Sequence, residues 1–487
     1  MKYLKSIFCL LFILLISSCS NYLDKAPEVT VDSKTVNYTD ISNMYAPVSG
    51  VYSWVRTEGT HWAVYGMTIT RDDDVDPGTT GDDWVKLNNY KYDNTLWFWN
   101  EPFSVLYYRL IKYCNTALVD LQKFEANCSG TSLATNHSYQ GEVRFLRAYA
   151  YYRLVQLFGP VPILKTNDQS DVHRRSVNSV YAYALEDLQY AIDNCQKCRP
   201  NQMDHAGAVT AYTAEMLAAK IYMNQNNYQK VYDLTKDIVD NGKFSLYSNY
   251  KELFKIPGKL CDESLFEIQT TDFGTGSGDV VGTNAWFGFQ GPANDGNISG
   301  WGWISPDKNF RDWATARGET VRAQNDFLYA GTTTAWGDVI RPAQGAETGC
   351  YNGKAYTPTS ELTPGRTDYG CNNNVRVFRY ADVLLMYAEA CLQLNQNLSD
   401  GITKFNLVRT RANMPTVSSL TLDGILDERR MELCMEWGDR FNDLVRTGKA
   451  VSVLTSEGYV YTPDKQYFPI PKAAIDISPQ LGEDVVQ

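Results

Sequence analysis

The sequence predicts a mainly α-helical protein whose helical scaffold carries long irregular insertions rich in aromatic residues. Three observations predict this class. Apolar residues recur with helical spacing in many segments, short turns of Asn, Gly or Pro separate those segments, and two long stretches lose this periodicity and gain Trp, Gly and Thr. The chain has 487 residues, which is long for a single core but compatible with one large helical domain that carries insertions.

Residues 1–18 have the pattern of an export signal. Two lysines precede an apolar run, Ile7–Ile16, and two serines lead from it to Cys19. The run is too short to cross a bilayer as a helix, since a crossing needs about 20 residues. The pattern predicts cleavage before Cys19 and lipid attachment to its thiol, so that residues 19–487 form one lipid-anchored domain. The alternative is a soluble secreted chain.

The helical scaffold is expected at about 100–243 and 375–450. From Tyr139 to Phe158 apolar residues recur every three or four positions, and Gly159 and Pro160 end that segment. Further helices are expected at 102–115, 180–192, 208–223, 228–239, 380–394, 402–411 and 423–435. The pair at 208–223 and 228–239 has the small crossing residues of a tetratricopeptide-like hairpin. Such pairs cannot bury their faces alone, so we expect them to stack into one core.

The two regions without helical periodicity are 54–99 and 244–374. Both contain several tryptophans among Gly, Thr and Asn residues. A long insertion in a compact protein is usually functional or disordered, and these two are too aromatic for disorder. We therefore expect the scaffold to present both regions to a ligand.

The charge and composition restrict the class of partner. The net charge is −11 and becomes more negative once the signal lysines are removed, which argues against nucleic-acid binding. Aromatic residues make up 13% of the chain, with 11 Trp and 33 Tyr. Their apolar faces and polar edges suit a sugar ring, which has a C–H face and a rim of hydroxyls.

The cysteine pattern gives no metal centre. Cys195 and Cys198 form a lone C-x-x-C, which is a poor zinc site without a second pair. We expect either a loop bridge or two inert thiols, and redox chemistry is the less favoured alternative. Cys391 and Cys434 fall within helical patterns and are expected in the core.

Several ordered motifs carry a resemblance to a known family. The C-terminal motifs are Arg379–Ala390, Phe405–Ala412, Asp427–Leu433, Gly438–Arg446 and Phe468–Pro471, and the N-terminal ones are Asn21–Pro27, Phe145–Ala148 and Phe158–Pro162. Together they resemble the SusD/RagB family. Two positions depart from its pattern: Trp437 stands where the family usually has Gly, and Thr447 where it often has Trp.

This resemblance implies a SusD-like fold and a lipoprotein exposed on the cell surface, anchored in the outer membrane. It implies a non-catalytic protein without a cofactor, which captures oligosaccharides and delivers them to a SusC-like TonB-dependent barrel. Some family members serve peptide uptake instead, so peptide binding is the alternative. A glycoside hydrolase is the third hypothesis, because two suitably placed carboxylates suffice for that chemistry. The sequence lacks H-E-x-x-H, the P-loop and G-x-S-x-G.

Candidate ligand contacts are the aromatic residues of the irregular regions. Trp97 and Trp99 would share one side of an extended segment that leads to Asn100, although Trp99 also suits the core. Gly302 permits close approach between Trp301 and Trp303. The complete aromatic set is Trp97, Trp99, Trp286, Trp301, Trp303 and Trp336, with Asn100 beside it.

Polar contacts are expected from the run that begins at Arg71. Sugar hydroxyls need partners when they lose water, and Arg71, Asp72 and Asp74 supply charged groups in a loop where family members place ligand contacts. Asp72, Asp74 and Asp76 also have the spacing of a calcium loop. That possibility is weak, because the glycine expected at the sixth position is a proline and the twelfth residue is Asp rather than Glu.

The acidic and basic residues of the C-terminal motifs are expected to be structural. Glu428, Arg429, Glu432 and Arg440 alternate in charge at helical spacing beside apolar residues. We therefore expect them to pair within the packed scaffold.

Overall fold

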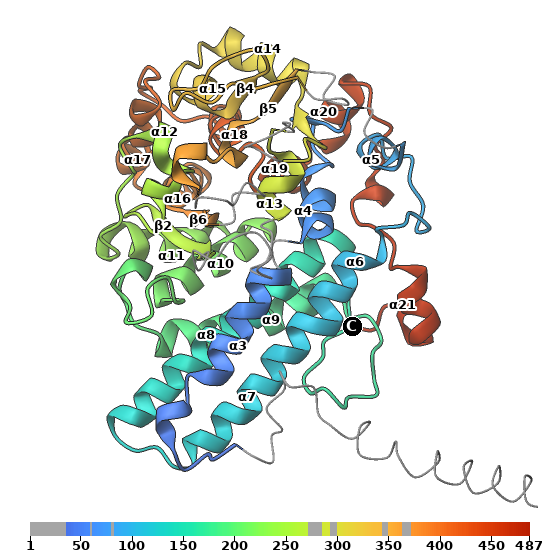
Figure 1. Ribbon diagram of the computed structural model, residues 1–487, viewed down its shortest axis with the longest axis vertical. Helices are drawn as coiled ribbons and strands as arrows, with labels where there is room; N and C mark the ends of the chain where they lie inside the picture. Colours follow the sequence, from blue (N-terminus) through green and yellow to red (C-terminus); the bar gives the residue numbers. More distant parts are fainter. Residues whose placement is uncertain are drawn as a thin grey trace, which may run out of the picture.

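The computed structural model describes residues 36–58, 61–78, 82–270, 285–292, 300–342, 349–362 and 372–487. Lys2, Cys19 and the rest of the predicted signal lie outside these residues. Long helices form the lower part of the molecule, and shorter helices and strands form the upper part (Figure 1). None of the helices in these ranges is both long and apolar enough to cross a membrane.

The N-terminal half is built from helices of very different length. They are α3 (Ala46–Glu58), α4 (Trp62–Ile69), α5 (Asp82–Asn88), α6 (Asn100–Phe103), α7 (Lys112–Glu125), α8 (Thr131–Phe158), α9 (Val177–Asn194), α10 (Ala211–Asn224) and α11 (Tyr228–Asn241). A π-helical stretch, η2 (Ser104–Ile111), joins α6 to α7. α8 packs along α9 and ends at Gly159, where φ is +64° and a Cβ would meet the ring of Tyr467 at 2.5 Å.

The expected hairpin is present. Thr210 caps the start of α10 by accepting a hydrogen bond from the Thr213 amide, and Asn227 caps the start of α11 by accepting one from the Lys230 amide. Such caps satisfy amides that have no partner within the helix. α11 packs on both α10 and α16, so the hairpin joins the two halves of the scaffold.

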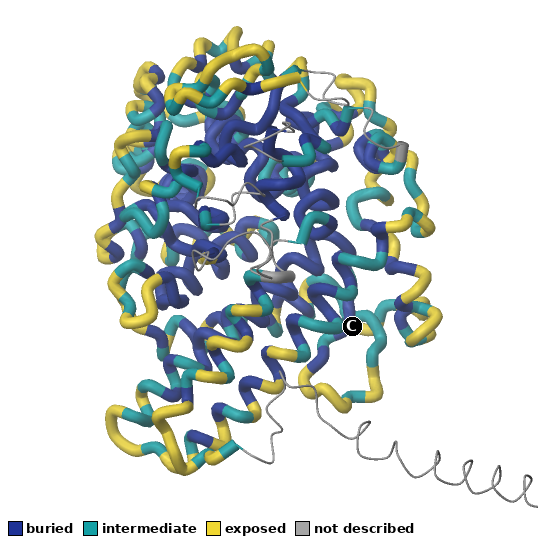
Figure 2. Tube along the Cα trace, in the orientation of Figure 1, coloured by how far each residue is buried: buried dark blue, intermediate teal, exposed yellow. Residues whose placement is uncertain are grey.

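The C-terminal helices complete the core. They are α16 (Tyr380–Leu394), α17 (Leu398–Arg411), α18 (Leu422–Glu432), α19 (Asp439–Arg446), α20 (Ala450–Ser456) and α21 (Lys472–Ile477). The tube in Figure 2 shows buried residues concentrated along α8, α10 and α16 and exposed residues at the rim. Cys391 and Cys434 are buried as expected. All eight cysteines in the described residues are free thiols, so Cys195 and Cys198 are not bridged.

The two regions expected to be irregular contain short elements. The first holds α4 and α5, and the second holds α12 (Tyr250–Leu253), α13 (Ala285–Gln290), α14 (Lys308–Arg317) and α15 (Val321–Asp326). Seven consecutive residues of α4 are buried. A helix that is buried all round has no polar face, and this is why its sequence lacks amphipathic periodicity.

The residues that the structure describes contain three two-stranded antiparallel sheets. β1 (Val75–Asp76) pairs with β3 (Ser305–Pro306), β2 (Ser264–Ile268) pairs with β6 (Val375–Arg379), and β4 (Phe327–Tyr329) pairs with β5 (Cys350–Asn352). The β1–β3 pair is important for the site, because it joins the first aromatic region to the second.

Candidate functional site

An exposed row of indole rings lies where the two aromatic regions meet. We call it the tryptophan arc, and it consists of Trp97, Trp62, Trp303 and Trp301. The Trp62 ring centroid lies 5.0 Å from that of Trp97 and 6.0 Å from that of Trp303, and Trp301 lies 5.1 Å from Trp303. Trp97 is 63% exposed, and the other three are partly exposed.

Three segments position the arc. Trp62 is the first residue of α4, where the His61 ring caps the helix by accepting a hydrogen bond from the Ala63 amide. Trp97 lies in the turn before α6. Trp301 and Trp303 follow α13, and their amides donate to the carbonyls of Gly288 and Phe289.

A buried aromatic layer supports the arc from below. Trp84 stacks on Phe98 with ring centroids 4.1 Å apart, and Phe289 meets Trp84 edge to face. This layer packs on α4 at Gly66, where a Cβ would come within 2.6 Å of the Phe289 ring. Rings held on such a base lose little further freedom when they bind a flat ligand.

The structure brings together three of the predicted aromatic contacts. Trp301 and Trp303 lie on the same side as expected, with Gly302 between them at φ +60°. Trp62 was missed, although it lies in the first aromatic region. It begins a buried helix, and only its position at the first turn leaves its ring partly exposed.

Two other predicted aromatic contacts lie in the core and are corrected. Residues 97–99 form a turn rather than an extended segment, so Trp99 points inward and donates its indole N–H to the Pro469 carbonyl. Trp286 is also buried, against Tyr65 and Phe287. Asn100 remains half-buried at the start of α6, and Trp336 lies apart from the arc, against Tyr356.

The predicted polar contacts are also interior residues. Arg71 is buried between Phe441 and Phe468 and donates to the carbonyls of Gln156 and Gln466. Asp72 accepts from the Asp74 amide. The sequence showed a polar run but did not show whether its side chains point to the surface or to the interior. The prediction for Arg71, Asp72 and Asp74 is therefore corrected, because they make contacts within the protein and do not face a ligand.

The acids proposed for calcium binding also have partners within the protein. The Asp74 carboxylate is paired with Arg430 at 2.6 Å, and the neighbouring Asp73 is paired with both Arg430 and Arg440. Asp76 accepts a hydrogen bond from the Gly78 amide. Within the described ranges, no group of three or more acidic, His or Cys side chains is placed to hold a metal ion.

Two family models match the chain. The model described as the SusD family matches residues 332–483, and the model described as starch-binding associating with outer membrane matches residues 21–238. A SusD-like protein of Bacteroides ovatus is 26% identical over 471 residues, which cover 88% of this chain and 80% of that protein. This chain is a member of the SusD family.

Solved structures confirm the SusD-like fold. Surface glycan-binding protein A from Bacteroides thetaiotaomicron, in complex with laminarihexaose, matches with a TM-score of 0.75 at 23% identity over 90% of this chain and 98% of that one. A laminarin-binding SusD-like protein matches with a TM-score of 0.76 at 23% identity, with 92% and 98% covered.

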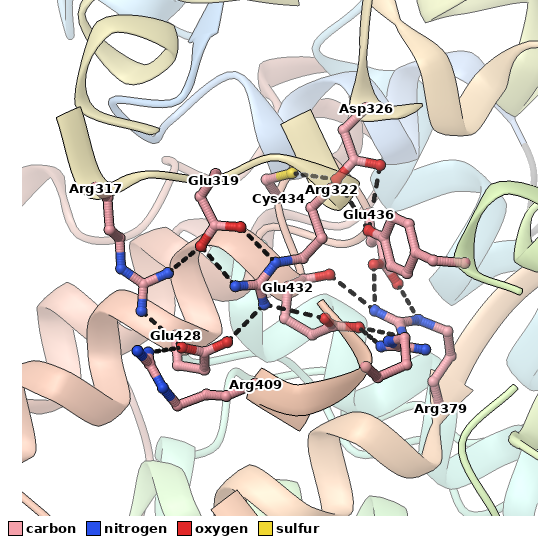
Figure 3. Close-up of polar contacts among 12 residues, drawn as sticks. Arg317, Glu319, Arg322, Asp326, Arg379, Arg409, Glu428, Glu432, Cys434 and Glu436 are labelled. Carbon is pink, nitrogen blue, oxygen red and sulfur yellow. Dashed lines mark hydrogen bonds and ion pairs between the residues drawn. The ribbon is translucent and has the colours of Figure 1, made fainter. Parts of the chain in front are cut away.

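The SusD-family motif around α18 forms a buried ionic network rather than a ligand site. Figure 3 shows Glu428 between the guanidinium groups of Arg317, Arg322 and Arg409, with N–O distances of 2.6, 2.7 and 2.7 Å. Arg379 joins Glu432 to Glu436 and also reaches Glu263. The structural role predicted for these charges is confirmed.

The pairing in this network decides the ionisation of its acids. Burial alone would raise the pKa of Glu432, but Arg411, Arg379 and Arg322 outweigh it and hold the pKa below its ordinary value. Trp437, one of the two departures from the SusD-family pattern, is buried beside this network and donates its indole N–H to the Arg376 carbonyl.

Proposed function

We propose that this SusD-family protein is a cell-surface glycan-binding lipoprotein that holds an oligosaccharide along the tryptophan arc. The observation that carries the proposal is the continuous row formed by the exposed Trp97 and the partly exposed Trp62, Trp303 and Trp301. Contact between such an apolar surface and water is unfavourable, and the C–H face of a sugar ring can replace that water. Relatives are named as binding laminarihexaose and xylogluco-oligosaccharide.

The row favours a chain of sugars over a single sugar. Its neighbouring ring centroids are 5 to 6 Å apart, so the four rings together offer a surface longer than one monosaccharide. The planes also differ, since Trp62 and Trp97 meet at 34° whereas Trp62 and Trp303 meet at 72°. A ligand that curves from one plane to the next would contact all four rings. Binding by stacking needs no chemical step, and we assign the protein no catalytic activity and no cofactor.

The test is affinity electrophoresis of the purified protein through gels that contain a panel of polysaccharides and peptides. We expect at least one glycan to retard the protein, and Trp97→Ala to abolish most of the retardation. Trp54→Ala is the matched control, because Trp54 is also partly exposed but stacks on Tyr113 outside the arc. Retardation by peptides alone would refute the proposal in favour of peptide capture. Release of reducing ends from a bound glycan would favour a hydrolase.

We further propose that a lipid on Cys19 anchors the protein to the outer membrane, and that the glycan passes to a SusC-like TonB-dependent barrel. One of the matching families is described as associating with the outer membrane. Tethering would keep the arc near the barrel at high effective concentration. Cys19→Ala should abolish surface retention and glycan uptake while leaving the affinity of the purified protein unchanged. Surface retention of this variant would disprove the anchor.

A further inference from the structure

A second concave site lies apart from the arc, among α12, α15, the end of β4 and the segment that carries Trp336. Its cavity measures about 580 Å³ and shares no residue with the arc. In Figure 1, α12 and α15 lie at the upper left of the molecule, whereas α4 and α6 lie nearer the right. The volume lies within the usual range of small-molecule sites, about 300 to 1,000 Å³, and is much larger than a simple inorganic anion needs.

Two lysines converge on the aromatic wall of this cavity. The Lys251 ammonium lies 4.5 Å from the Trp336 ring centroid, and that of Lys255 lies 5.9 Å from the same centroid and 5.2 Å from that of Tyr356. Lys255 is buried and donates to the Gly353 carbonyl at 2.7 Å. Neither lysine forms an ion pair among the described residues.

The surroundings of Lys255 leave its charge poorly compensated. Burial, together with the nearby Arg376, lowers its pKa to about 7, although Glu361 and Asp326 act in the opposite direction. Glu361 accepts a hydrogen bond from the Ile256 amide, and Asp326 accepts one from the Tyr250 hydroxyl. An anion placed beside Lys255 would therefore favour the protonated, charged form of this lysine.

The walls of the cavity carry no acidic residue in the part of the chain that the structure describes. Asp338, the acid that contacts the Tyr356 hydroxyl, also accepts a hydrogen bond from the Thr359 amide at 2.9 Å. In a protein of net charge −11, the lining itself carries two lysines and no acid, and Glu361 and Asp326 act on Lys255 from outside the lining.

We propose that this cavity is a second saccharide site, specific for a sugar that carries a carboxylate or sulfate group. The anionic group would lie between the ammonium groups of Lys251 and Lys255, and the sugar ring would pack against the indole of Trp336 and the ring of Tyr356. Thr334, which is hydrogen-bonded to the Tyr356 hydroxyl, adds a hydroxyl at the edge. Charge-assisted hydrogen bonds provide the selectivity for an acidic sugar.

This site extends the proposed function without depending on it. The arc contributes ring stacking, which is indifferent to the charge of the sugar, and the lysine cavity contributes charge selectivity. An acidic oligosaccharide could be bound at either place, whereas a neutral one would be bound at the arc alone. Variants in the two places therefore separate the two proposals.

The test is isothermal titration calorimetry of the purified protein with tetragalacturonic acid, a sulfated carrageenan tetrasaccharide, a neutral galactose tetrasaccharide and a hexaglutamate peptide. We expect at least one acidic sugar to bind in the Trp97→Ala background, where the arc is impaired. Lys251→Met and Trp336→Ala should each weaken that binding at least tenfold. Methionine keeps most of the apolar stem of the lysine, and Lys251 is not buried like Lys255, so this variant should fold.

The control is Lys472→Met, which removes an exposed lysine on α21 and should leave every affinity unchanged. The proposal is overturned if neither acidic sugar binds, if the neutral sugar or the peptide binds this cavity as well as the acidic sugars do, or if Lys251→Met leaves the affinity unchanged. If the proposal for the arc is wrong, the calorimetry would give a different result. Trp97→Ala would then have no effect on any glycan, whatever the result for Lys251→Met.

Discussion

Around α18 the protein buries charges, whereas along the arc it exposes aromatic rings. Arg322, Glu428 and Glu432 are fully buried, while the Trp97 ring is 63% exposed. Each arrangement is unfavourable in free energy unless other groups compensate for it. The charges are compensated by one another, since each carboxylate of the network is paired with at least one cationic group. The exposed rings are compensated only when a ligand covers them.

The difference separates stability from binding. The network of buried charges specifies how α14, α15, β6 and α17 fit around α18, and it contributes to the fold wherever its members remain paired. An exposed ring contributes little to folding, because the same ring is exposed in the unfolded chain. Substitutions in the charge network should therefore lower the free energy of unfolding and leave ligand affinity unchanged. Substitutions in the arc should lower ligand affinity and leave the free energy of unfolding nearly unchanged.

The largest effect is expected from Arg379→Ala. This change leaves Glu432 and Glu436 with fewer cationic partners and removes the contact to Glu263. Breaking a buried ionic contact typically costs about 3–5 kcal/mol. We expect denaturant unfolding to show a loss of that size in the free energy of unfolding, with glycan affinity unchanged in the folded protein. Lost affinity without lost stability would contradict the separation of the two regions.

The second effect concerns Glu142, a buried acid that forms no ion pair with any residue that the structure describes. Its carboxylate accepts a hydrogen bond from the Tyr52 hydroxyl, and burial raises its pKa to about 8. The folded chain therefore keeps a proton that the unfolded chain releases near pH 4.5. This group lowers the stability as the pH rises from about 4.5 to 8, by at most about 1.4 kcal/mol per pH unit.

Glu142→Gln should remove that dependence. Glutamine can still accept the Tyr52 hydrogen bond but cannot lose a proton, so the variant should gain stability relative to the parent as the pH rises towards 8. Unfolding measured at pH 5, 6.5 and 8 checks this. Glu186→Gln, an exposed change on the neighbouring α9, should follow the parent. Parallel curves for Glu142→Gln and the parent would show that Glu142 is already ionised in the fold.

The third effect belongs to the arc. Trp62 contacts both Trp97 and Trp303, so Trp62→Ala interrupts the row at its middle, whereas Trp301→Ala shortens it at one end. For the glycan that binds, we expect Trp62→Ala to weaken affinity at least tenfold, about 1.4 kcal/mol, and Trp301→Ala to weaken it less. Titration calorimetry measures both. Equal losses of affinity in the two variants would mean that the ligand does not bind along the row of rings.

The sequence predicted the scaffold well because its helices are amphipathic. The segment 380–394 coincides with α16, and 228–239 lies within α11 (Tyr228–Asn241). The start of α8 was missed by eight residues, since its first turns are polar. The short buried helices of the aromatic regions were missed for the opposite reason, because α4 has hardly any polar face to reveal its period.

The site could be predicted only in part, because the sequence does not show whether a side chain points to the surface or to the core. Trp97 and Trp99 are two residues apart, yet a turn sends one to the surface and the other to the core. The acids at 72–74 look like a ligand-binding loop, but their partners Arg430 and Arg440 lie more than 350 residues away in the sequence. Such pairings follow from the tertiary fold and leave no local pattern.

The smallest effect should come from an ion pair at the surface, which completes the comparison with Arg379. Lys308 and Asp312 pair one turn apart on α14, and both side chains are more than 60% exposed. Water and salt screen such a pair, and exposed pairs typically contribute about 0.2–1 kcal/mol. We expect Lys308→Ala to change the free energy of unfolding by less than about 1 kcal/mol, and the change to vanish in 1 M salt. A loss as large as that of Arg379→Ala would mean that burial does not decide what an ionic contact contributes to this fold.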